Sequence, residues 1–254
     1  MAFTKWEAFL ENQIEGFFNK KFGSALEPVE VEKKLEKEMA KAKAKAKKRT
    51  KNGDQAGLLP NEYTILMNAD DCHHLSSRRF LDRLHVLAEK RVILLDAFMD
   101  GKLTVAFQKD ASLSLGVCRV QSSFSDRVQR VAQAVEDQHT IVLQRPSFQP
   151  PLNLPAEYTF ASFTVVKGTD LDSYLAFGEK KIFLGRRERS DFILTDPNAS
   201  RVHASVDYER HRHLLKDEQS TNGTLLNGKP VLEAWLRHGD EIQIGNSVLR
   251  YEVI

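Results

Sequence analysis

Residues 200–228 read SRVHASVDYERHRHLLKDEQSTNGTLLNG. Short segments in which apolar and polar residues alternate precede this stretch, as at Phe160 to Val166 and at Lys181 to Leu184. Turn-forming pairs interrupt the alternations about every ten residues. The Asn-Gly pairs at 222–223 and 227–228 are the strongest short hairpin signals that a sequence can carry. This pattern predicts an all-β sandwich or barrel for the carboxy-terminal half of the chain.

Polar clusters stand where these strands are expected to end. Two guanidiniums, two hydroxyls and an amide can hold a doubly charged oxyanion and a peptide backbone, because Arg gives charge-assisted bonds and Asn both donates and accepts. No good nucleophile is paired with a base, and the Ser200 and His203 pair lacks the Gly-x-Ser-x-Gly elbow of hydrolases. We therefore expect a binding site and no enzyme. The candidate binding residues are Arg186, Ser200, Arg201, Thr221 and Asn222.

The order of these clusters points to a family. The sequence contains Gly185-Arg186, then Ser200-Arg201-Val202-His203, then Thr221-Asn222-Gly223. In this order and spacing, residues 159–254 resemble a forkhead-associated (FHA) domain. The resemblance implies an eleven-stranded β-sandwich that binds phosphothreonine peptides by loops at one end.

The resemblance also implies residue roles. Arg186, Ser200 and Thr221 should contact the phosphate, with Arg201 beside it. Asn222 should hold the peptide main chain just after the phosphothreonine.

Other positions of the motif are expected to be structural. His203 should pack and shape the Ser200 loop. The next loop residues Arg187, Glu188 and Arg189 add more charge than the signature demands, which can alter the choice of peptide. The positions with an implied structural role are Gly185, His203, Gly223 and Asn227.

The amino-terminal half reads as a small α+β domain. Apolar residues recur at three- and four-residue steps from Thr4 to Phe22, which predicts a helix that Gly23 ends. Pro28 suits the first turn of a second helix, which we expect to continue to Asn52-Gly53. A strand, a helix and three strands should follow, with the helices on one face of a small, mostly antiparallel sheet. Their predicted bounds are 62–67, 70–90, 92–98, 103–108 and 113–121, with Asp100-Gly101 as the turn between the second and third strands.

Three motifs carry a second resemblance. They are Phe18-x3-Phe22-Gly23, Pro28-x-Glu30-Val31-x3-Leu35 and Leu59-Pro60-Asn61-Glu62-Tyr63. These motifs resemble the amino-terminal domain of actinobacterial FhaA-type proteins, which pair it with a carboxy-terminal FHA domain. Members are linked to the control of cell-wall synthesis, where the FHA domain docks on the intracellular domain of a kinase or pseudokinase phosphorylated on threonine.

Prolines suggest where the two domains meet. Four of them lie between residues 146 and 155, and such a segment forms a semi-rigid extended linker. The predicted organisation is an FhaA-type domain over 1–123, a linker over 124–158 and an FHA domain over 159–254.

The basic residues are unevenly distributed. Seven of them, without an acid, lie between Lys41 and Lys51, whereas the whole chain carries a net charge of +2. This basic segment has three interpretations: a solvated helix tip, a contact with anionic lipid or a contact with nucleic acid. The segment has no aromatic residue on which a base could stack. We expect no nucleic acid among the partners. The alternative function is a nucleic-acid or membrane-surface binding protein that acts through the basic helix 41–51.

The remaining features favour a signalling adaptor. Two cysteines and no signal peptide favour a cytoplasmic protein, recruited to the inner face of the membrane if the basic segment contacts lipid. The run Asp70 to His74 holds metal-ligand residue types, but neighbours on a helix point in different directions. We expect no metal and no cofactor. His211 and His213 are expected to cap a solvent-facing hairpin, and the whole chain reads as a non-enzymatic adaptor that binds phosphothreonine.

Overall fold

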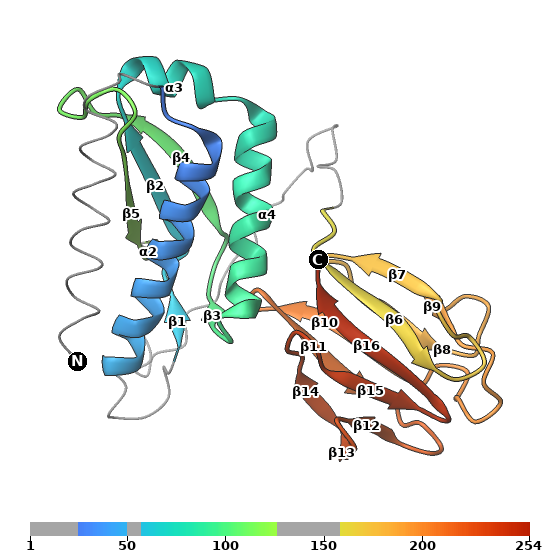
Figure 1. The fold of residues 1–254 in the computed structure, drawn as a ribbon. Helices are drawn as coiled ribbons and strands as arrows, with labels where there is room; N and C mark the ends of the chain where they lie inside the picture. Colours follow the sequence, from blue (N-terminus) through green and yellow to red (C-terminus); the bar gives the residue numbers. More distant parts are fainter. Residues whose placement is uncertain (1–24, 50–56, 126–157) are drawn as a thin grey trace, which may run out of the picture. The chain divides into compact units, whose positions relative to one another are not determined.

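The computed structural model describes residues 25–49, 57–125 and 158–254 (Figure 1). The helix expected over 4–22, the expected helix end at Asn52-Gly53 and most of the 124–158 linker lie outside these ranges. The chain divides into two compact units, residues 1–88 with 101–125 and residues 89–100 with 126–254. Within the described ranges, no helix combines the length and the apolar character that crossing a bilayer requires.

A long amphipathic helix covers the sheet of the first unit. The helix α2 (Pro28–Arg49) begins at the predicted proline. Lys34 Nζ donates to the Cys118 carbonyl at 3.0 Å, and Ser122 Oγ donates to Glu38 Oε1 at 3.1 Å, so polar contacts hold α2 against the sheet. One apolar stripe of α2 is buried because its members recur every three or four residues: Val31, Leu35, Met39 and Ala42.

The sheet of the first unit is mixed. Strand β2 (Glu62–Met67), confirmed at its predicted bounds, lies between β4 (Thr104–Lys109) and β5 (Cys118–Ser123). It pairs in parallel with β4 and antiparallel with β5, so the expected mostly antiparallel sheet is wrong. The chain returns from β2 to β4 through two helices, and such a crossover brings a strand back in the same direction. Two further short strands are β1 (Leu58–Leu59), which belongs to the first unit, and β3 (Phe98–Met99), which belongs to the second.

The helix predicted over 70–90 is two helices, α3 (Ala69–Leu75) and α4 (Arg78–Leu94). The side chain of Asn68 caps α3 by accepting the backbone N–H groups of Asp70 and Asp71. Ser77 Oγ accepts the N–H of Phe80 at 3.3 Å, at the start of α4. A serine that can satisfy free amides of a new helix favours a break at this point, even though the apolar spacing continues across it.

The strand predicted over 92–98 is also wrong, because α4 continues to Leu94 and only Phe98 and Met99 of this region form a strand. Val92 and Ile93 favour strands by their branching. Both are buried on α4, where Ala88 and Leu84 precede them at helical spacing and are buried too. Burial along one face of α4 therefore outweighs the preference of Val92 and Ile93 for a strand. The hairpin expected at Asp100-Gly101 does not form, since β4 pairs with β2 instead.

The second unit contains a β-sandwich (Figure 1). A five-stranded sheet has the order β14-β11-β10-β8-β9, and a six-stranded sheet has the order β13-β12-β15-β16-β6-β7. These are the eleven strands that the FHA resemblance implied. Their bounds are β6 Ala161–Lys167, β7 Tyr174–Phe177, β8 Ile182–Gly185, β9 Phe192–Ile193, β10 Ala204–Glu209, β11 Arg212–Asp217, β12 Thr224–Leu226, β13 Lys229–Val231, β14 Glu233–Trp235, β15 Glu241–Ile244 and β16 Ser247–Val253.

His213 is part of the sandwich core, so its expected place at a solvent-facing hairpin is wrong. Its side chain is fully buried. The ring Nδ1 lies 2.8 Å from Tyr251 Oη, and Nε2 lies 2.9 Å from the Gly178 carbonyl. The rings of Phe160 and Phe177 pack on the imidazole. Burial lowers the pKa of His213 to about 4, so the ring is neutral at pH 7.

Candidate functional site

The register of the five-stranded sheet gathers three loops at one end of the sandwich. Ala204 at the start of β10 pairs with Leu184 near the end of β8 and with Asp217 at the end of β11. The loops after β8, before β10 and after β11 therefore meet. They line a hollow of about 820 Å³. Its lining contains all five predicted binding residues and five more: Arg186, Arg187, Pro197, Asn198, Ala199, Ser200, Arg201, Val202, Thr221 and Asn222.

Gly185 lets two of these loops come together. A Cβ atom at this position would stand 2.6 Å from the Arg201 carbonyl oxygen and 2.9 Å from that of Ser200. Because no side chain fits, the backbones can pair directly. The N–H of Arg186 donates to the Ser200 carbonyl at 3.0 Å, and the N–H of Arg187 donates to the Arg201 carbonyl at 2.9 Å. The Gly-Arg pair thus sets Arg186 beside Ser200.

His203 joins the Ser200 loop to the Gly223 loop through its two ring nitrogens. The N–H of Ser200 lies 3.0 Å from His203 Nδ1, and His203 Nε2 lies 3.1 Å from the Gly223 carbonyl. A backbone amide only donates, so Nδ1 accepts and the ring proton sits on Nε2, from which it is donated to Gly223. The ring is fully buried, and burial lowers its pKa although the Gly223 carbonyl opposes this effect. Gly223 itself has φ +76°, a conformation that side chains other than glycine rarely adopt.

The two hydroxyls of the site are in contact. The N–H of Thr221 donates to Ser200 Oγ at 3.0 Å, and the two side-chain oxygens lie 3.4 Å apart. Asn222 Nδ2 donates to the Asn198 carbonyl at 2.9 Å, which leaves its amide oxygen without a bond to the described residues. Ser200, Thr221 and Asn222 come from loops that are about twenty residues apart in sequence, yet they form one polar wall of the hollow.

Two carboxylates that the sequence reasoning missed anchor the loops. Asp196 is fully buried and accepts the backbone N–H groups of Asn198, Asn246 and Ser247. Burial alone would raise the pKa of Asp196, but these bonds outweigh it and hold the pKa below its usual value. Asp217 accepts from Ser220 and from Thr224 Oγ1 at 2.6 Å. The Asp-Pro-Asn run at 196–198 signals a turn, whereas nothing in the sequence identifies Ser247 as a partner.

Asn227 stands apart from the hollow. It forms a hairpin turn with Gly228 between β12 and β13, and both residues have positive φ, +50° and +77°. Its side chain donates to Asp240 Oδ1 at 2.8 Å and accepts the N–H of Glu241 at 2.9 Å. The structure thus places this predicted position in a tight turn of the type that an Asn-Gly pair favours.

The hollow is strongly cationic. Its lining contains three guanidiniums, those of Arg186, Arg187 and Arg201, and no aspartate or glutamate. All three arginines are exposed, and none of them forms an ion pair with a described residue. Several unpaired guanidiniums beside two hydroxyls suit a dianion such as a phosphate group.

Two family models match the chain. The FhaA N-terminal domain model covers residues 3–121, and the FHA domain model covers residues 182–245. The chain is an FhaA-type protein. It has two domains of the α+β class, and its carboxy-terminal part is an FHA domain built as a β-sandwich, as the sequence predicted.

Curated relatives share part of this FhaA-type chain. Glycogen accumulation regulator GarA of Mycobacterium tuberculosis is 36% identical over 85 residues, which covers 34% of this chain and 52% of GarA. FHA domain-containing protein FhaA of the same organism is 41% identical over 64 residues, 25% of this chain and 12% of that protein. The matches therefore span about half of GarA and a smaller share of FhaA.

A solved structure also resembles the chain. It is described as the FhaA FHA domain complexed with an intracellular domain, and it is 30% identical. The match covers 36% of this chain and 99% of that chain, with a TM-score of 0.34.

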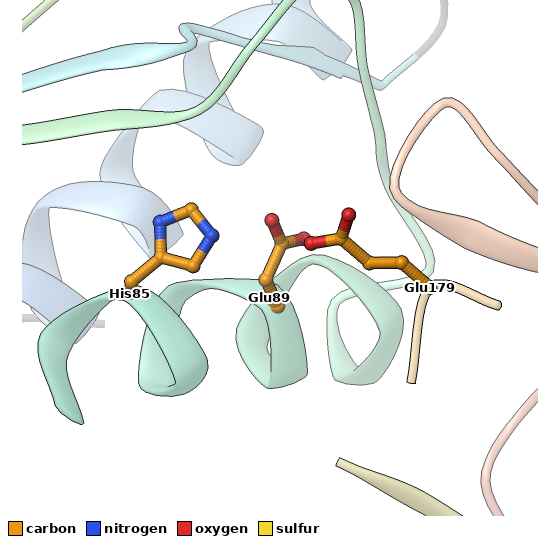
Figure 2. A group of neighbouring side chains, drawn as sticks. All are labelled: His85, Glu89 and Glu179. Atoms are coloured by element: carbon orange, nitrogen blue, oxygen red, sulfur yellow. The ribbon is translucent and has the colours of Figure 1, made fainter. Parts of the chain in front are cut away.

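Residue types that can bind a metal ion also lie outside the hollow. His85 and Glu89 lie one turn apart on α4, and Figure 2 labels them together with Glu179. His85 belongs to the first unit and Glu179 to the second, so we infer nothing from the three together. In the run Asp70 to His74, the two oxygens of the Asp71 carboxylate accept the N–H groups of Leu26 and Gly116, so this side chain has a structural role.

Proposed function

We propose that the hollow binds a phosphothreonine of a partner protein, and that the chain acts as a non-enzymatic signalling adaptor. The observation that carries this proposal is the convergence of three guanidiniums without carboxylate partners, two hydroxyls and an amide around one hollow. The FHA family of the domain supports the choice of phosphothreonine among phosphate ligands.

Each wall of the hollow suits one part of the ligand. Arg186, Ser200 and Thr221 would donate to the phosphate oxygens, with Arg201 beside them. Asn222 would bond the peptide main chain, because its amide oxygen remains available while Nδ2 already bonds Asn198. The resemblance to FHA domains adds that phosphoserine should bind more weakly, since the threonine methyl group fills a small apolar niche.

The FhaA-type architecture supports a finer assignment of the partner. We propose the threonine-phosphorylated intracellular domain of a Ser/Thr kinase or pseudokinase, in the control of cell-wall synthesis. This assignment rests on the family, whose members are linked to that process.

A peptide library tests the proposed ligand class. The full chain would be incubated with peptides that carry one fixed phosphothreonine between randomised neighbours, and with matched threonine and phosphoserine libraries. We expect retention of the phosphothreonine library, weaker retention of phosphoserine and none of threonine. The best peptide would then be titrated by calorimetry in its phosphorylated and plain forms. Equal affinities for the two forms would overturn the proposal.

The basic segment supports a second activity. Within the described part of α2, Lys41, Lys45 and Lys47 are exposed. Attraction to anionic lipid amounts to about 1 kcal/mol for each basic residue near a membrane surface. We propose this contact as an addition to phosphopeptide binding that would recruit the adaptor to the inner face of the membrane.

A further inference from the structure

The positive charge of the hollow exceeds what one phosphate can neutralise. A phosphothreonine carries about −1.5 to −2 charges at pH 7. Three guanidiniums line the hollow, and no acidic residue lines it. One phosphate would therefore leave about one positive charge uncompensated beside the bound peptide.

Arg187 provides the additional charge. The N–H of Arg187 donates to the Arg201 carbonyl at 2.9 Å, which holds the backbones of two arginines side by side. Like charges held close to each other repel, and an anion between them relieves that repulsion. The next residue, Glu188, is exposed and forms no ion pair with a described residue, so the chain does not neutralise Arg187 itself.

The backbone of Arg187 is fixed on both sides. In addition to the bond from its N–H, its carbonyl accepts the N–H of Ser190 at 2.9 Å and closes a tight turn. Asp191 secures the other end of the turn by accepting the N–H of Phe183 at 3.0 Å. A long cationic side chain on a fixed backbone, at the rim of a peptide-binding hollow, can select among ligands with little ordering cost.

We propose that Arg187 makes the site select phosphothreonine segments that carry a second acidic group close to the phosphothreonine. The group can be the carboxylate of Asp or Glu or the phosphate of a second phosphorylated residue, since a guanidinium binds both. This inference rests on the proposed function, because it concerns the same hollow.

Arg189 provides a matched control for the test. It lies on the same exposed loop and carries the same charge, but it does not line the hollow. Arg187→Gln and Arg189→Gln therefore remove equal charge from one loop at different places. Neither residue makes a side-chain ion pair with a described residue, so both variants should fold like the native chain.

The experiment titrates the full chain with a series of peptides. Each has one phosphothreonine among Ala, Gly and Gln, and single Glu substitutions are placed in turn at the neighbouring positions on both sides. A second series carries phosphothreonine in place of Glu. We expect at least one position where Glu raises affinity about fivefold, as an ion pair near the surface can, and where a second phosphate raises it more. Arg187→Gln should abolish this gain, whereas Arg189→Gln should keep both the gain and the native affinity for the neutral peptide.

The outcomes separate the two proposals. If the singly phosphorylated neutral peptide binds but no acidic neighbour strengthens binding, or if the gain persists in Arg187→Gln, the selection by Arg187 is overturned while the phosphothreonine site stands. If phosphorylated and plain threonine peptides bind equally in every series, the proposed function fails, and this inference fails with it.

Discussion

The imidazole of His203 accepts the backbone N–H of Ser200, a residue that lines the hollow, at 3.0 Å. Through its other nitrogen the same ring reaches the Gly223 carbonyl. The loop that presents Ser200 and the loop that presents Thr221 and Asn222 are therefore held by one buried side chain. This arrangement makes the shape of the hollow depend on a residue that does not line it.

Replacement of His203 by Ala should loosen both loops. The variant leaves the N–H of Ser200 and the Gly223 carbonyl without their partner and creates a cavity, which together should lower the free energy of unfolding by about 3 kcal/mol. Urea unfolding followed by circular dichroism measures the loss. Replacement of the exposed His238 by Ala is the control. It also removes the acceptor of one backbone N–H, that of Val253, but at the surface, where water can take its place, so the expected effect is much smaller. A His203→Ala chain as stable as the native one would show that the two bonds contribute little.

Arg186 should be the costliest position for ligand binding. Truncation to Ala removes one guanidinium from the proposed phosphate contact and should weaken binding of a phosphothreonine peptide by about 2 to 5 kcal/mol. Asn222→Ala should weaken binding while the dependence on phosphate remains, since its proposed partner is the peptide backbone. Titration calorimetry at constant salt compares both variants with Arg189→Ala, which should bind like the native chain. Native affinity in Arg186→Ala would contradict the proposed phosphate contact.

The carboxy-terminal half could be predicted well because its signals are local. Asn227 and Gly228 both adopt positive φ in a two-residue turn, which is what an Asn-Gly pair predicts on its own. The polar residues at the ends of β8, β10 and β11 were predictable as a set because short strands with turns at their ends bring such residues together. The anchoring bond from Ser247 to Asp196 was not predictable, since 51 residues separate its partners and only the fold brings them together.

The amino-terminal half departed from prediction where burial overrides local preference. Val92 and Ile93 favour strands individually, but α4 buries both along one face. Ser77 caps the start of α4, although the helical spacing of apolar residues continues across this point. Likewise, the sequence predicted a solvent-facing hairpin for His213 and could not show that its ring bonds Tyr251 and Gly178 in the core.

The basic segment should be separable from the phosphopeptide site. Replacement of Lys41, Lys43, Lys45 and Lys47 by Gln changes α2 in the first unit and removes no residue that lines the hollow. Phosphopeptide affinity should stay within about twofold, and the free energy of unfolding within about 0.5 kcal/mol for each surface substitution. Co-sedimentation with vesicles that contain phosphatidylserine should fall in the variant and should fall with salt in the native chain. A tenfold loss of phosphopeptide affinity would instead assign the segment to the peptide site.

Acid should destabilise the sandwich through His213. The pKa of the ring is about 4 in the folded chain because burial disfavours its charged form, against about 6.5 when unfolded. A lowered pKa means that the unfolded state binds the proton first, so the stabilising contribution is complete above pH 6.5 and is lost as the pH falls toward 4. The loss should reach about 3 kcal/mol. Urea unfolding at several pH values between 7.5 and 4.5 measures it.

The assignment to His213 needs a site-specific measurement, because His203 also has a lowered pKa and acts in the same direction. Two-dimensional NMR of the imidazole resonances in the native chain resolves the rings without a substitution. The His213 resonances should stay at their neutral positions down to about pH 5. Aspartates with a lowered pKa, such as Asp196, lose their stabilising contribution as the pH falls through the ordinary Asp pKa of about 3.9 and below, so most of a loss between pH 7.5 and 4.5 is not theirs. Titration of the His213 ring near pH 6.5 would show that its charge is tolerated in the core and would contradict the prediction.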